Sequence, residues 1–553
     1  MLSYTDKIFR NKNYSNYLVL YLFIYLFFQI NLIVKAGTTW DDLKLIETTP
    51  RIIHKFNLFF SDPTNGFLSE FVSNFEFYGY LVLVPAYLFS KNDIVINLFS
   101  FTFKNIFNIN IINNQDLEYI LRHTFLSIYV IFSLFIIFKL YSTISDEKRS
   151  FQFIVILSLV PTFSGHALFN LKDVPFMIQN FIAVLFFINY LIRFDKANYY
   201  DLIKVGLFFG LLLLIRFNGL ALIAIYYFFS YLFLAKDFLT IKKNTLNLTA
   251  ISFISLVVLF IGTPSAWQKP KLWIEKTIET QFNIYWDSYV LTNGNFTFAM
   301  DVNPLYLLTW FNFRLPVFIH IFLGISIYLL IKSFINKSYN FSLIYIFSLY
   351  FLGTILFSFM VLRPVVYDGI RQYLFLLPFF ILIVTECVNN LNLKKIKEST
   401  IFFTIVIYLL FTSFGLGPYR YTYFNELTNV PNITIDCDEI GGCGNWQTDY
   451  WGYSGKSLIN EINQDFEGDI YLCSPEHVFS TYLVNEKVNV ISEPEKAKDE
   501  FYALYLHRPM LKNDTCGFKQ HDLNITCEII YKEEVNLRFN SINLSYLSLC
   551  NKS

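Results

Sequence analysis

Acidic residues in two separate stretches are the first candidates for chemistry. Asp41 and Asp42 lie in "AGTTWDDLK", directly after an apolar run, and Asp173 follows Lys172 in "SGHALFNLKDVPFM", between two further apolar runs. A carboxylate at a membrane surface is a suitable general base, because it can accept the proton of an attacking hydroxyl group. Either stretch alone is also compatible with an ordinary solvated loop, but the two together favour a site.

Cationic and aromatic residues accompany these carboxylates. Arg216 interrupts the apolar run "LLLLIRFNGL", and "LRPVVYDGIRQYLF" carries Arg363, Tyr367, Asp368 and Arg371. Guanidinium groups fit phosphate oxygens, and a lone cation between apolar segments needs an internal partner. Arg363 and Arg371 also fit side chains that extend to lipid headgroups. We therefore predict a phosphate-binding site that includes the carboxylates.

Histidines and cysteines add little to this prediction. His166, in the same stretch as Lys172, is most simply structural, although its position makes it a substrate-binding candidate. The spacing contains no Cys-x-x-Cys and few histidines near the cysteines, so no metal site and no cofactor is predicted. A divalent ion beside the carboxylates is compatible with the sequence but not required by it.

The composition defines the class of protein. Of 553 residues, 54% are hydrophobic and only 16% are charged, which exceeds what a soluble core buries and is typical of an α-helical multi-pass membrane protein. The formal net charge of +0 argues against nucleic acid as a partner.

Apolar runs long enough to cross a bilayer position these residues. We expect about eleven transmembrane helices, at residues 17–36, 119–141, 151–169, 174–192, 203–215, 217–235, 246–264, 316–333, 341–362, 372–389 and 400–417. Two shorter runs, 76–90 and 94–103, are predicted to lie in the membrane interface.

Lysine and arginine residues set the predicted orientation, because such residues in short loops stay cytoplasmic. With the N-terminus inside, the cytoplasmic loops all carry cations: Lys148, Arg149, Arg193, Lys196, Lys236, Lys242, Lys243, Lys332, Lys337, Lys394, Lys395 and Lys397. The outer face then carries large loops at 37–118 and 262–315 and shorter turns. The candidate site residues share this face, in the first of these loops and in the turns.

The last part of the chain differs from the rest. We predict a transmembrane domain at 1–417 and a small outer α/β domain at 418–553, since "DIYLCS", "VNVISE", "EFYALYLHR" and "CEIIYKEEVNLRF" alternate like strands and "EHVFSTYLV" fits a helix. Six of seven cysteines fall in this tail, which indicates disulfides and an oxidising compartment. Cys437 and Cys443 are the first pair expected.

The order of several motifs resembles a known family. "TWDD", "GHALFNLKDVPF", "RPVVYDGIRQYLFLLPF", "PYRYTYFNEL" and "TDYWGYSGKSL" follow one another as in bacterial membrane proteins of the dolichyl-phosphate-mannose protein mannosyltransferase type, glycosyltransferase family 39. These are GT-C glycosyltransferases, which use polyprenyl-phosphate sugars. Each motif is short, and only their order makes the resemblance specific.

The resemblance implies an activity and residue roles. It implies inverting transfer of a sugar from a polyprenyl-phosphate carrier to a protein, lipid or glycan acceptor, at the outer face of a bacterial plasma membrane. Asp41 matches the family's base, although the family has Asp-Glu where this chain has Asp41-Asp42. Asp173 matches a second acidic position. Lys172, Arg216, Arg363 and Arg371 are then candidates for the carrier phosphate.

Two other classes of protein remain open at this stage. A transporter or flippase of lipid-linked saccharides would share the span count and the arginines, but would be expected to show paired repeats and interrupted helices near the bilayer midplane. An inactive membrane anchor for a binding domain would make Asp41 and Asp173 dispensable. The clustering of polar residues at one face favours an enzyme.

Overall fold

A computed structural model describes most of the chain. The described residues are 14–61, 77, 80–105, 111–267, 269–282, 288–336, 341–390, 397–429, 437–439, 442–443, 446–497, 499–508, 516, 525–537 and 540–552.

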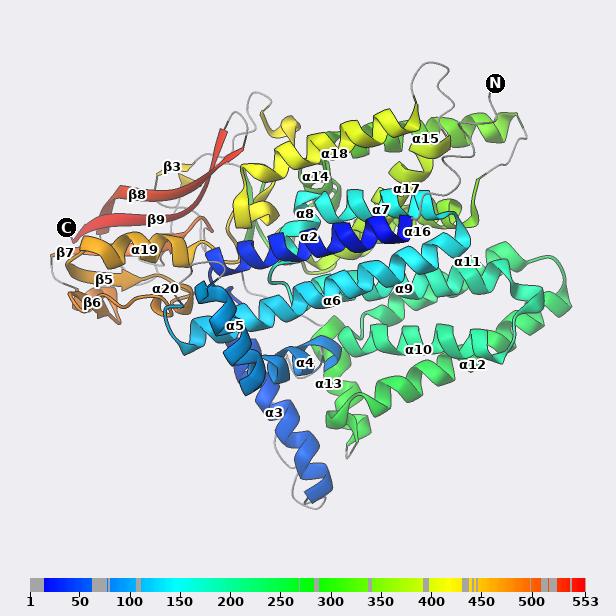
Figure 1. The fold of residues 1–553 in the computed structure, drawn as a ribbon, viewed down its shortest axis with the longest axis horizontal. Coiled ribbons are helices and arrows are strands. Elements are labelled where there is room, and N and C mark those ends of the chain that lie inside the picture. Colours follow the sequence, from blue (N-terminus) through cyan, green and yellow to red (C-terminus); the bar gives the residue numbers. More distant parts are fainter. Residues whose placement is uncertain are drawn as a thin grey trace.

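Long apolar helices build the larger part of the molecule and run roughly along its longest axis (Figure 1). The α-helices of this part are α2 (Tyr14–Lys35), α3 (Asp42–Ser61), α4 (Tyr80–Ser90), α5 (Asp93–Asn105), α6 (Asn114–Ile144), α7 (Glu147–Leu159), α8 (Pro161–His166), α9 (Asp173–Ile192), α10 (Tyr199–Ile215), α11 (Gly219–Leu234), α12 (Phe238–Ile261), α13 (Pro270–Phe282), α14 (Tyr306–Arg314), α15 (Val317–Ile335), α16 (Leu343–Leu362), α17 (Leu377–Asn390) and α18 (Glu398–Phe414).

Short elements join these helices. The 3-10 turns are η2 (Phe194–Lys196), η3 (Pro264–Ala266), η4 (Arg371–Leu376), η5 (Gly417–Thr422) and η6 (Glu426–Asn429), and two hairpins are formed by β1 (Tyr289–Thr292) with β2 (Asn295–Phe298) and by β3 (Cys437–Glu439) with β4 (Gly442–Cys443).

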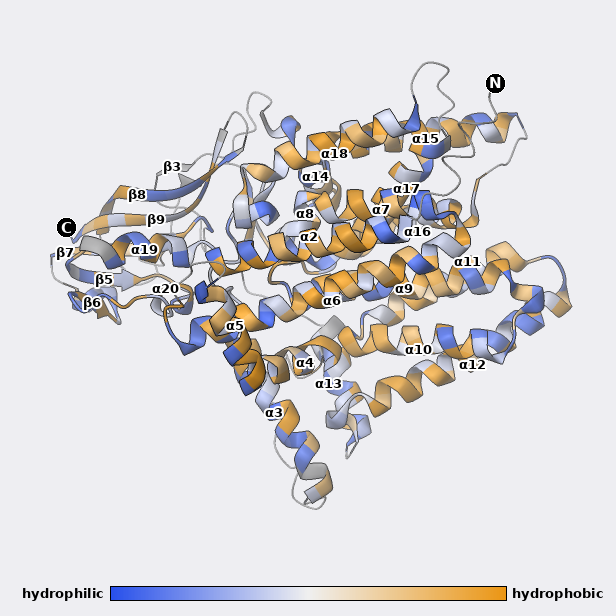
Figure 2. Ribbon diagram, in the orientation of Figure 1, coloured by the Kyte–Doolittle hydropathy of each residue, from blue (hydrophilic) through white to orange (hydrophobic). Residues whose placement is uncertain are grey.

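The predicted class of multi-pass helical membrane protein is confirmed. Among the described residues, 7 helices are long and apolar enough to cross a membrane, or up to 8 with the bent pair α4 and α5 counted as one span. Apolar residues line these helices over most of their length (Figure 2). Large side chains such as Phe132, Phe253 and Phe411 are exposed on them, as expected of surfaces that face lipid. Each of the eleven predicted runs contains helix, but the number of crossings stays a prediction.

One of the eleven predicted apolar runs is broken, and the two shorter runs form a bent pair of helices. The run 151–169 divides into α7 and α8 at Pro161, which lacks the backbone N–H needed to continue α7. Gly165 in α8 lies so close to η5 that an added Cβ would stand 2.1 Å from the backbone nitrogen of Tyr421. The runs 76–90 and 94–103 form α4 and α5, which meet at an angle of 72°.

The C-terminal part forms a small α/β domain, as predicted. Its elements are α19 (Gly455–Asp465), β5 (Gly468–Leu472), α20 (His477–Ser480), β6 (Val488–Ile491), η7 (Pro494–Lys496), β7 (Glu500–Leu506), β8 (Ile525–Leu537) and β9 (Asn540–Lys552). The sheet has the order β6-β5-β7-β9-β8, parallel among the first three strands and antiparallel at β7–β9 and β9–β8. The boundary predicted at 417/418 stays a prediction.

Three features of this domain were not predicted correctly. The predicted helix at "EHVFSTYLV" is only the short α20, and neither α19 nor β9 was predicted. The alternation of Ile542, Leu544 and Tyr546, all buried, is a strand signal that marks β9.

Disulfides link this domain, in pairs that the sequence did not identify. Cys473 pairs with Cys516, and Cys527 on β8 pairs with Cys550 on β9. Cys437 and Cys443 lie opposite each other in the β3–β4 hairpin. Their side chains are outside the described residues, so that bond stays a prediction.

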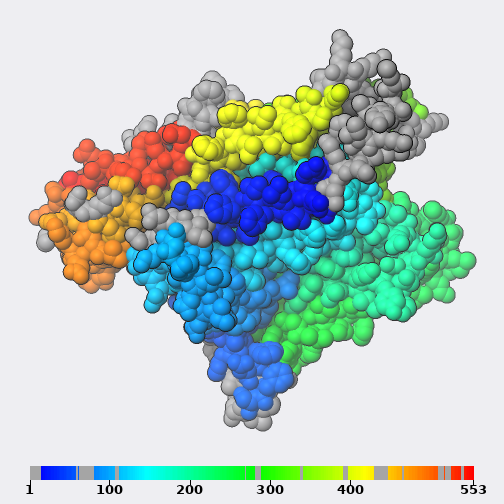
Figure 3. Space-filling model, in the orientation of Figure 1, coloured from blue at the N-terminus to red at the C-terminus, as the bar shows by residue number. Residues whose placement is uncertain are grey.

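The C-terminal domain covers one end of the helix bundle, which we call the domain end (Figures 1 and 3). Trp446, Tyr450, Trp451 and Tyr453 belong to the same hydrophobic core as the bundle helices. The other end, which we call the loop end, carries η2 and the short connection between α11 and α12.

Candidate functional site

Segments that are far apart in the sequence converge at the domain end. They are the loop 36–41 after α2, the turn 167–172 before α9, Arg216 at the end of α10, the loop 363–370 before η4, and part of the C-terminal domain. We call the ionic group that they form the charged cluster: Asp41, Lys172, Asp173, Arg216, Asp368, Arg371 and Arg508.

Asp41 lies between two cations of this cluster. Its Oδ2 atom is 2.7 Å from Nζ of Lys172 and 3.9 Å from Nη1 of Arg371, and 13% of the side chain is exposed. Burial alone would raise the pKa of Asp41, but the charges of Lys172 and Arg371 more than offset it, so the pKa is lowered. The carboxylate is therefore ionised at neutral pH, as a general base must be.

Asp42 has a different environment although it is the next residue. At the first turn of α3, its Oδ2 atom accepts hydrogen bonds from the backbone N–H of Thr39 at 2.7 Å and from the hydroxyl groups of Thr39 and Thr38. His123 Nε2 lies 3.2 Å away. Burial raises the pKa of Asp42, and the charge of His123 and these hydrogen bonds lower it below the usual value. Asp42 anchors the loop, so Asp41 is the stronger candidate of the two.

Asp173 is held by its own turn and by a cation from another helix. Asn170 accepts from the backbone N–H of Asp173 at 2.8 Å, and its amide group donates to Oδ2 of Asp173 at 2.9 Å. Arg216 forms an ion pair with Oδ1. The internal partner that Arg216 needs is therefore Asp173.

Arg371 and Asp368 extend the cluster toward the C-terminal domain. The Arg371 guanidinium lies 4.8 Å from the ring centre of Tyr367 and 4.7 Å from that of Trp451. It interacts electrostatically with Asp41, Asp368 and Asp173. Asp368 accepts a hydrogen bond from Nη2 of Arg508 at 2.8 Å.

Two predicted residues lie outside this arrangement. Arg363 is exposed at the C-terminal end of α16, in a left-handed conformation with φ of 43°, and none of the cluster's ion pairs includes it. His166 is buried behind the cluster, 3.4 Å from Nδ2 of Asn170 and 3.4 Å from the hydroxyl of Tyr450. It supports the turn that carries Asp173.

Sequence reasoning missed the residues that the C-terminal domain contributes. Arg508 ends the predicted strand "EFYALYLHR", and Trp451 lies in "TDYWGYSGKSL", but no local pattern distinguishes them from other polar and aromatic residues. Trp40 was also missed. Its ring centre lies 4.1 Å from the Arg508 guanidinium. Its position directly before the candidate base in "TWDD" is the sequence signal that could have identified it.

The cluster combines a base with an excess of positive charge. It holds three carboxylates and four cations. Among the described residues, Nε of Arg371 and Oδ1 of Asp368 are buried without a hydrogen-bond partner. Such a site can bind an anion and accept a proton at neighbouring atoms. No group of three His, Cys, Asp or Glu side chains in the described part of the chain is arranged to hold a metal ion.

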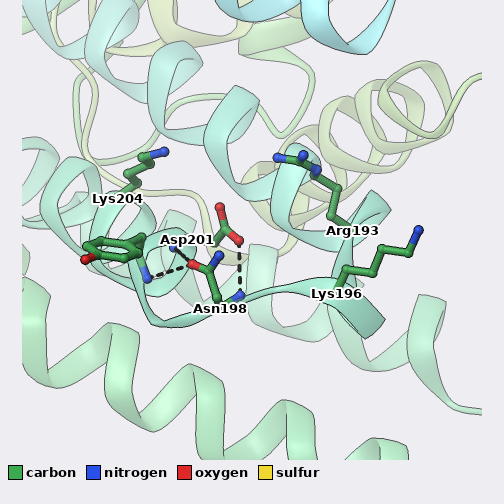
Figure 4. A pocket seen from close by; sticks show the side chains of 6 residues that line it. Arg193, Lys196, Asn198, Asp201 and Lys204 are labelled. Atoms are coloured by element: carbon green, nitrogen blue, oxygen red, sulfur yellow. Dashed lines mark hydrogen bonds between the residues drawn. The ribbon is translucent and has the colours of Figure 1, made fainter.

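The pocket drawn in Figure 4 is at the loop end, remote from this cluster. Arg193, Lys196 and Lys204 surround it together with Asn198, Tyr200 and Asp201. Asn198 caps α10 by accepting from the backbone of Tyr200 and Asp201. The basic residues there are exposed and include two of the loop cations on which the predicted orientation depends.

Comparison with known proteins gives structural similarity only. Crystal structures of ArnT from Cupriavidus metallidurans, in the apo state and bound to undecaprenyl phosphate, are each similar with a TM-score of 0.45 and 10% sequence identity. The alignments cover 96% and 97% of this chain and 98% of each ArnT chain. No family model and no curated protein sequence matches. Similarity at this level establishes neither family nor activity.

Proposed function

We propose that this protein is a glycosyltransferase of the GT-C type that transfers a sugar from a polyprenyl-phosphate carrier to an acceptor hydroxyl. The observation that carries the proposal is Asp41, an ionised carboxylate held 2.7 Å from Lys172 and 3.9 Å from Arg371. The cluster lies at the ends of apolar helices, where the phosphate of a lipid carrier meets the membrane surface.

The geometry supports a single displacement. Asp41 accepts the proton of the acceptor hydroxyl while the acceptor oxygen forms a bond to the anomeric carbon. The bond between that carbon and the phosphate oxygen breaks, and its electron pair leaves with the carrier phosphate. Lys172, Arg371 and Arg216 stabilise the negative charge that grows on the phosphate. Attack opposite the leaving group inverts the anomeric configuration.

The remaining parts of the proposal concern the other groups and the location. Asp173 orients the acceptor or Asp41, and Tyr367 and Asp368 hold Arg371 and contribute to substrate binding. The domain end is the outer face of a bacterial plasma membrane, with the N-terminus of the chain in the cytoplasm. A carrier of the mannosyl phosphate type, as in the family that the sequence resembles, is the first donor to test.

Substitution of Asp41 by asparagine tests the proposal. Purified protein is incubated with radiolabelled polyprenyl-phosphate sugars and membranes, and labelled acceptor is measured. We expect Asp41→Asn to lower transfer by about 100-fold to 10,000-fold, the usual contribution of a general base. Glu47→Gln is the matched control, because Glu47 is exposed on the adjoining helix α3 and undergoes the same change from acid to amide. Equal transfer by Asp41→Asn and the wild type would contradict the role of Asp41.

The same preparation separates an enzyme from a transporter. A transporter of lipid-linked saccharides would move the carrier across reconstituted vesicles without forming labelled acceptor. Movement without transfer, in wild-type protein that is folded, would replace the proposed enzyme by the transporter.

A further inference from the structure

The loop that carries Asp41 is held by the C-terminal domain. The backbone N–H of Gly37 donates to the carbonyl of Tyr453 at 3.1 Å, and that of Trp40 donates to the carbonyl of Trp451 at 2.7 Å. His477 Nε2 donates to the carbonyl of Thr39 at 2.9 Å. Three hydrogen bonds therefore attach residues 37–40 of the loop to the C-terminal domain.

Arg508 adds the charged part of this contact. It lies after β7, is 8% exposed, and places its guanidinium 4.1 Å from the ring centre of Trp40. The same guanidinium donates to Asp368 at 2.8 Å. Arg508 thus joins the residue before Asp41 to a carboxylate of the loop before Arg371. Arg371 is itself in contact with the C-terminal domain, through Trp451.

We propose that Arg508 is a positioning residue, through which the C-terminal domain fixes the Asp41 loop against Lys172 and Arg371. The inference rests on the proposed function for its effect on turnover, but its effect on the loop is independent of the reaction. A displacement of a catalytic group by about 1 Å can cost about 100-fold in rate, so the attachment of the loop has a direct kinetic consequence.

A general docking role does not account for this contact. A separate ion pair attaches the domain to the bundle: Lys456 on α19 donates to Asp116 at 2.9 Å and to the carbonyl of Val34 at 3.2 Å. That pair contacts α6 and the end of α2. Arg508 instead contacts Trp40 in the loop that presents Asp41 and Asp368 in the loop that precedes Arg371.

Two measurements on the full-length protein test the inference. The first is hydrogen exchange of the backbone amides in peptides that span residues 36–45, which contain the Trp40 amide. The second is the separate determination of kcat and KM for transfer. The variants are Arg508→Ala, Arg508→Lys and Asp368→Asn, with Lys487→Ala as the control, because Lys487 forms an exposed ion pair with Glu467 elsewhere in the same domain.

The inference predicts a specific pattern. Arg508→Ala increases exchange at residues 36–45 at least 10-fold while peptides of β5 keep their wild-type exchange. It lowers kcat about 100-fold with KM changed less than threefold. Arg508→Lys restores part of kcat, since it keeps the charge next to Asp368. At residues 36–45, exchange in the double variant Arg508→Ala with Asp368→Asn is no faster than in Arg508→Ala alone, because Asp368 acts on this loop through Arg508. Lys487→Ala matches the wild type throughout.

The outcomes distinguish this inference from the proposed function. Unchanged exchange at residues 36–45 in Arg508→Ala overturns the positioning role, whatever the transfer assay shows. Faster exchange also in β5 overturns it, because it reveals general loosening of the domain. Faster exchange confined to the loop, in a protein whose wild type transfers no sugar, retains the positioning role and rejects the proposed function. A rise in KM with normal kcat assigns Arg508 to ground-state binding and overturns positioning.

Discussion

The two ends of the helix bundle hold buried carboxylates in different ways. At the loop end, Glu386 on α17 accepts hydrogen bonds from Tyr141 at 2.5 Å, Arg149 at 3.3 Å and Ser342 at 3.4 Å. One carboxylate there has three donors, which come from α6, α7 and the residue that caps α16. At the domain end, three carboxylates share four cations, and several polar atoms in the described residues have no hydrogen-bond partner.

This difference separates a structural contact from a binding site. A carboxylate with three protein donors has its hydrogen-bonding capacity largely filled, so it ties helices together and offers little to a ligand. A cluster with one more cation than carboxylates, in which Asp41 is paired with two cations, has positive charge left to bind an incoming anion. The comparison can be tested because similar residues occur at both ends.

Arginine substitutions at the two ends should show the largest difference. We expect Arg371→Met to lower kcat about 100-fold to 1,000-fold, the usual cost of removing one donor that stabilises transition-state charge. Arg149→Met, which removes the ion pairs with Asp146 and Glu386, should leave kcat within about twofold. Transfer from a polyprenyl-phosphate sugar to the acceptor, measured under saturating donor, checks both variants. Similar losses in the two would remove the distinction between the ends.

The helical architecture was predictable because its signal is local. A run of about 20 apolar residues specifies a membrane helix without reference to the rest of the chain, and each predicted run contains helix in the structure. The break at Pro161 was missed because proline is tolerated in membrane helices when neighbours satisfy the backbone. Here η5 packs against α8 through Gly165, a contact between residues more than 250 positions apart.

The candidate site was only partly predictable, for a related reason. Asp41, Lys172, Asp173, Arg216 and Arg371 stand out because charge is rare in apolar sequence, and the structure brings them together. Arg508 belongs to a domain in which charged residues are common, so an arginine there does not stand out as a candidate site residue. The difference between Asp41 and Asp42 depends on Thr38, Thr39 and His123, and the last of these is supplied by α6.

Substitution of Glu386 should affect stability without affecting turnover. Glu386→Gln keeps the shape of the side chain but loses the charge that Arg149 pairs with, so we expect a loss of about 1–3 kcal/mol, the usual cost of disturbing a buried hydrogen-bonded group. Thermal unfolding in detergent measures the change, with transfer assayed well below the midpoint. Glu398→Gln is the control, because its ion pair with Lys148 at the same end is about one-third exposed and should contribute under about 1 kcal/mol. Reduced turnover at full stability would place Glu386 in the reaction pathway.

The pH dependence of transfer should respond to one lysine and not to another. The pKa of Asp41 is lowered because Lys172 and Arg371 outweigh burial. A group with a depressed pKa stays ionised as pH falls until its own low pKa is reached, so the wild-type acid limb of kcat/KM lies below the usual range of a carboxyl group. Lys172→Met removes the larger of the two charge effects that lower the pKa of Asp41, while burial still raises it. The pKa of Asp41 and the acid limb therefore move to higher pH. Lys196→Met, at the loop end, should leave the limb in place. If the acid limb does not move in Lys172→Met, the carboxylate that titrates in catalysis is not the one paired with Lys172. The base is then another carboxylate of the charged cluster, and Asp173 is the first alternative.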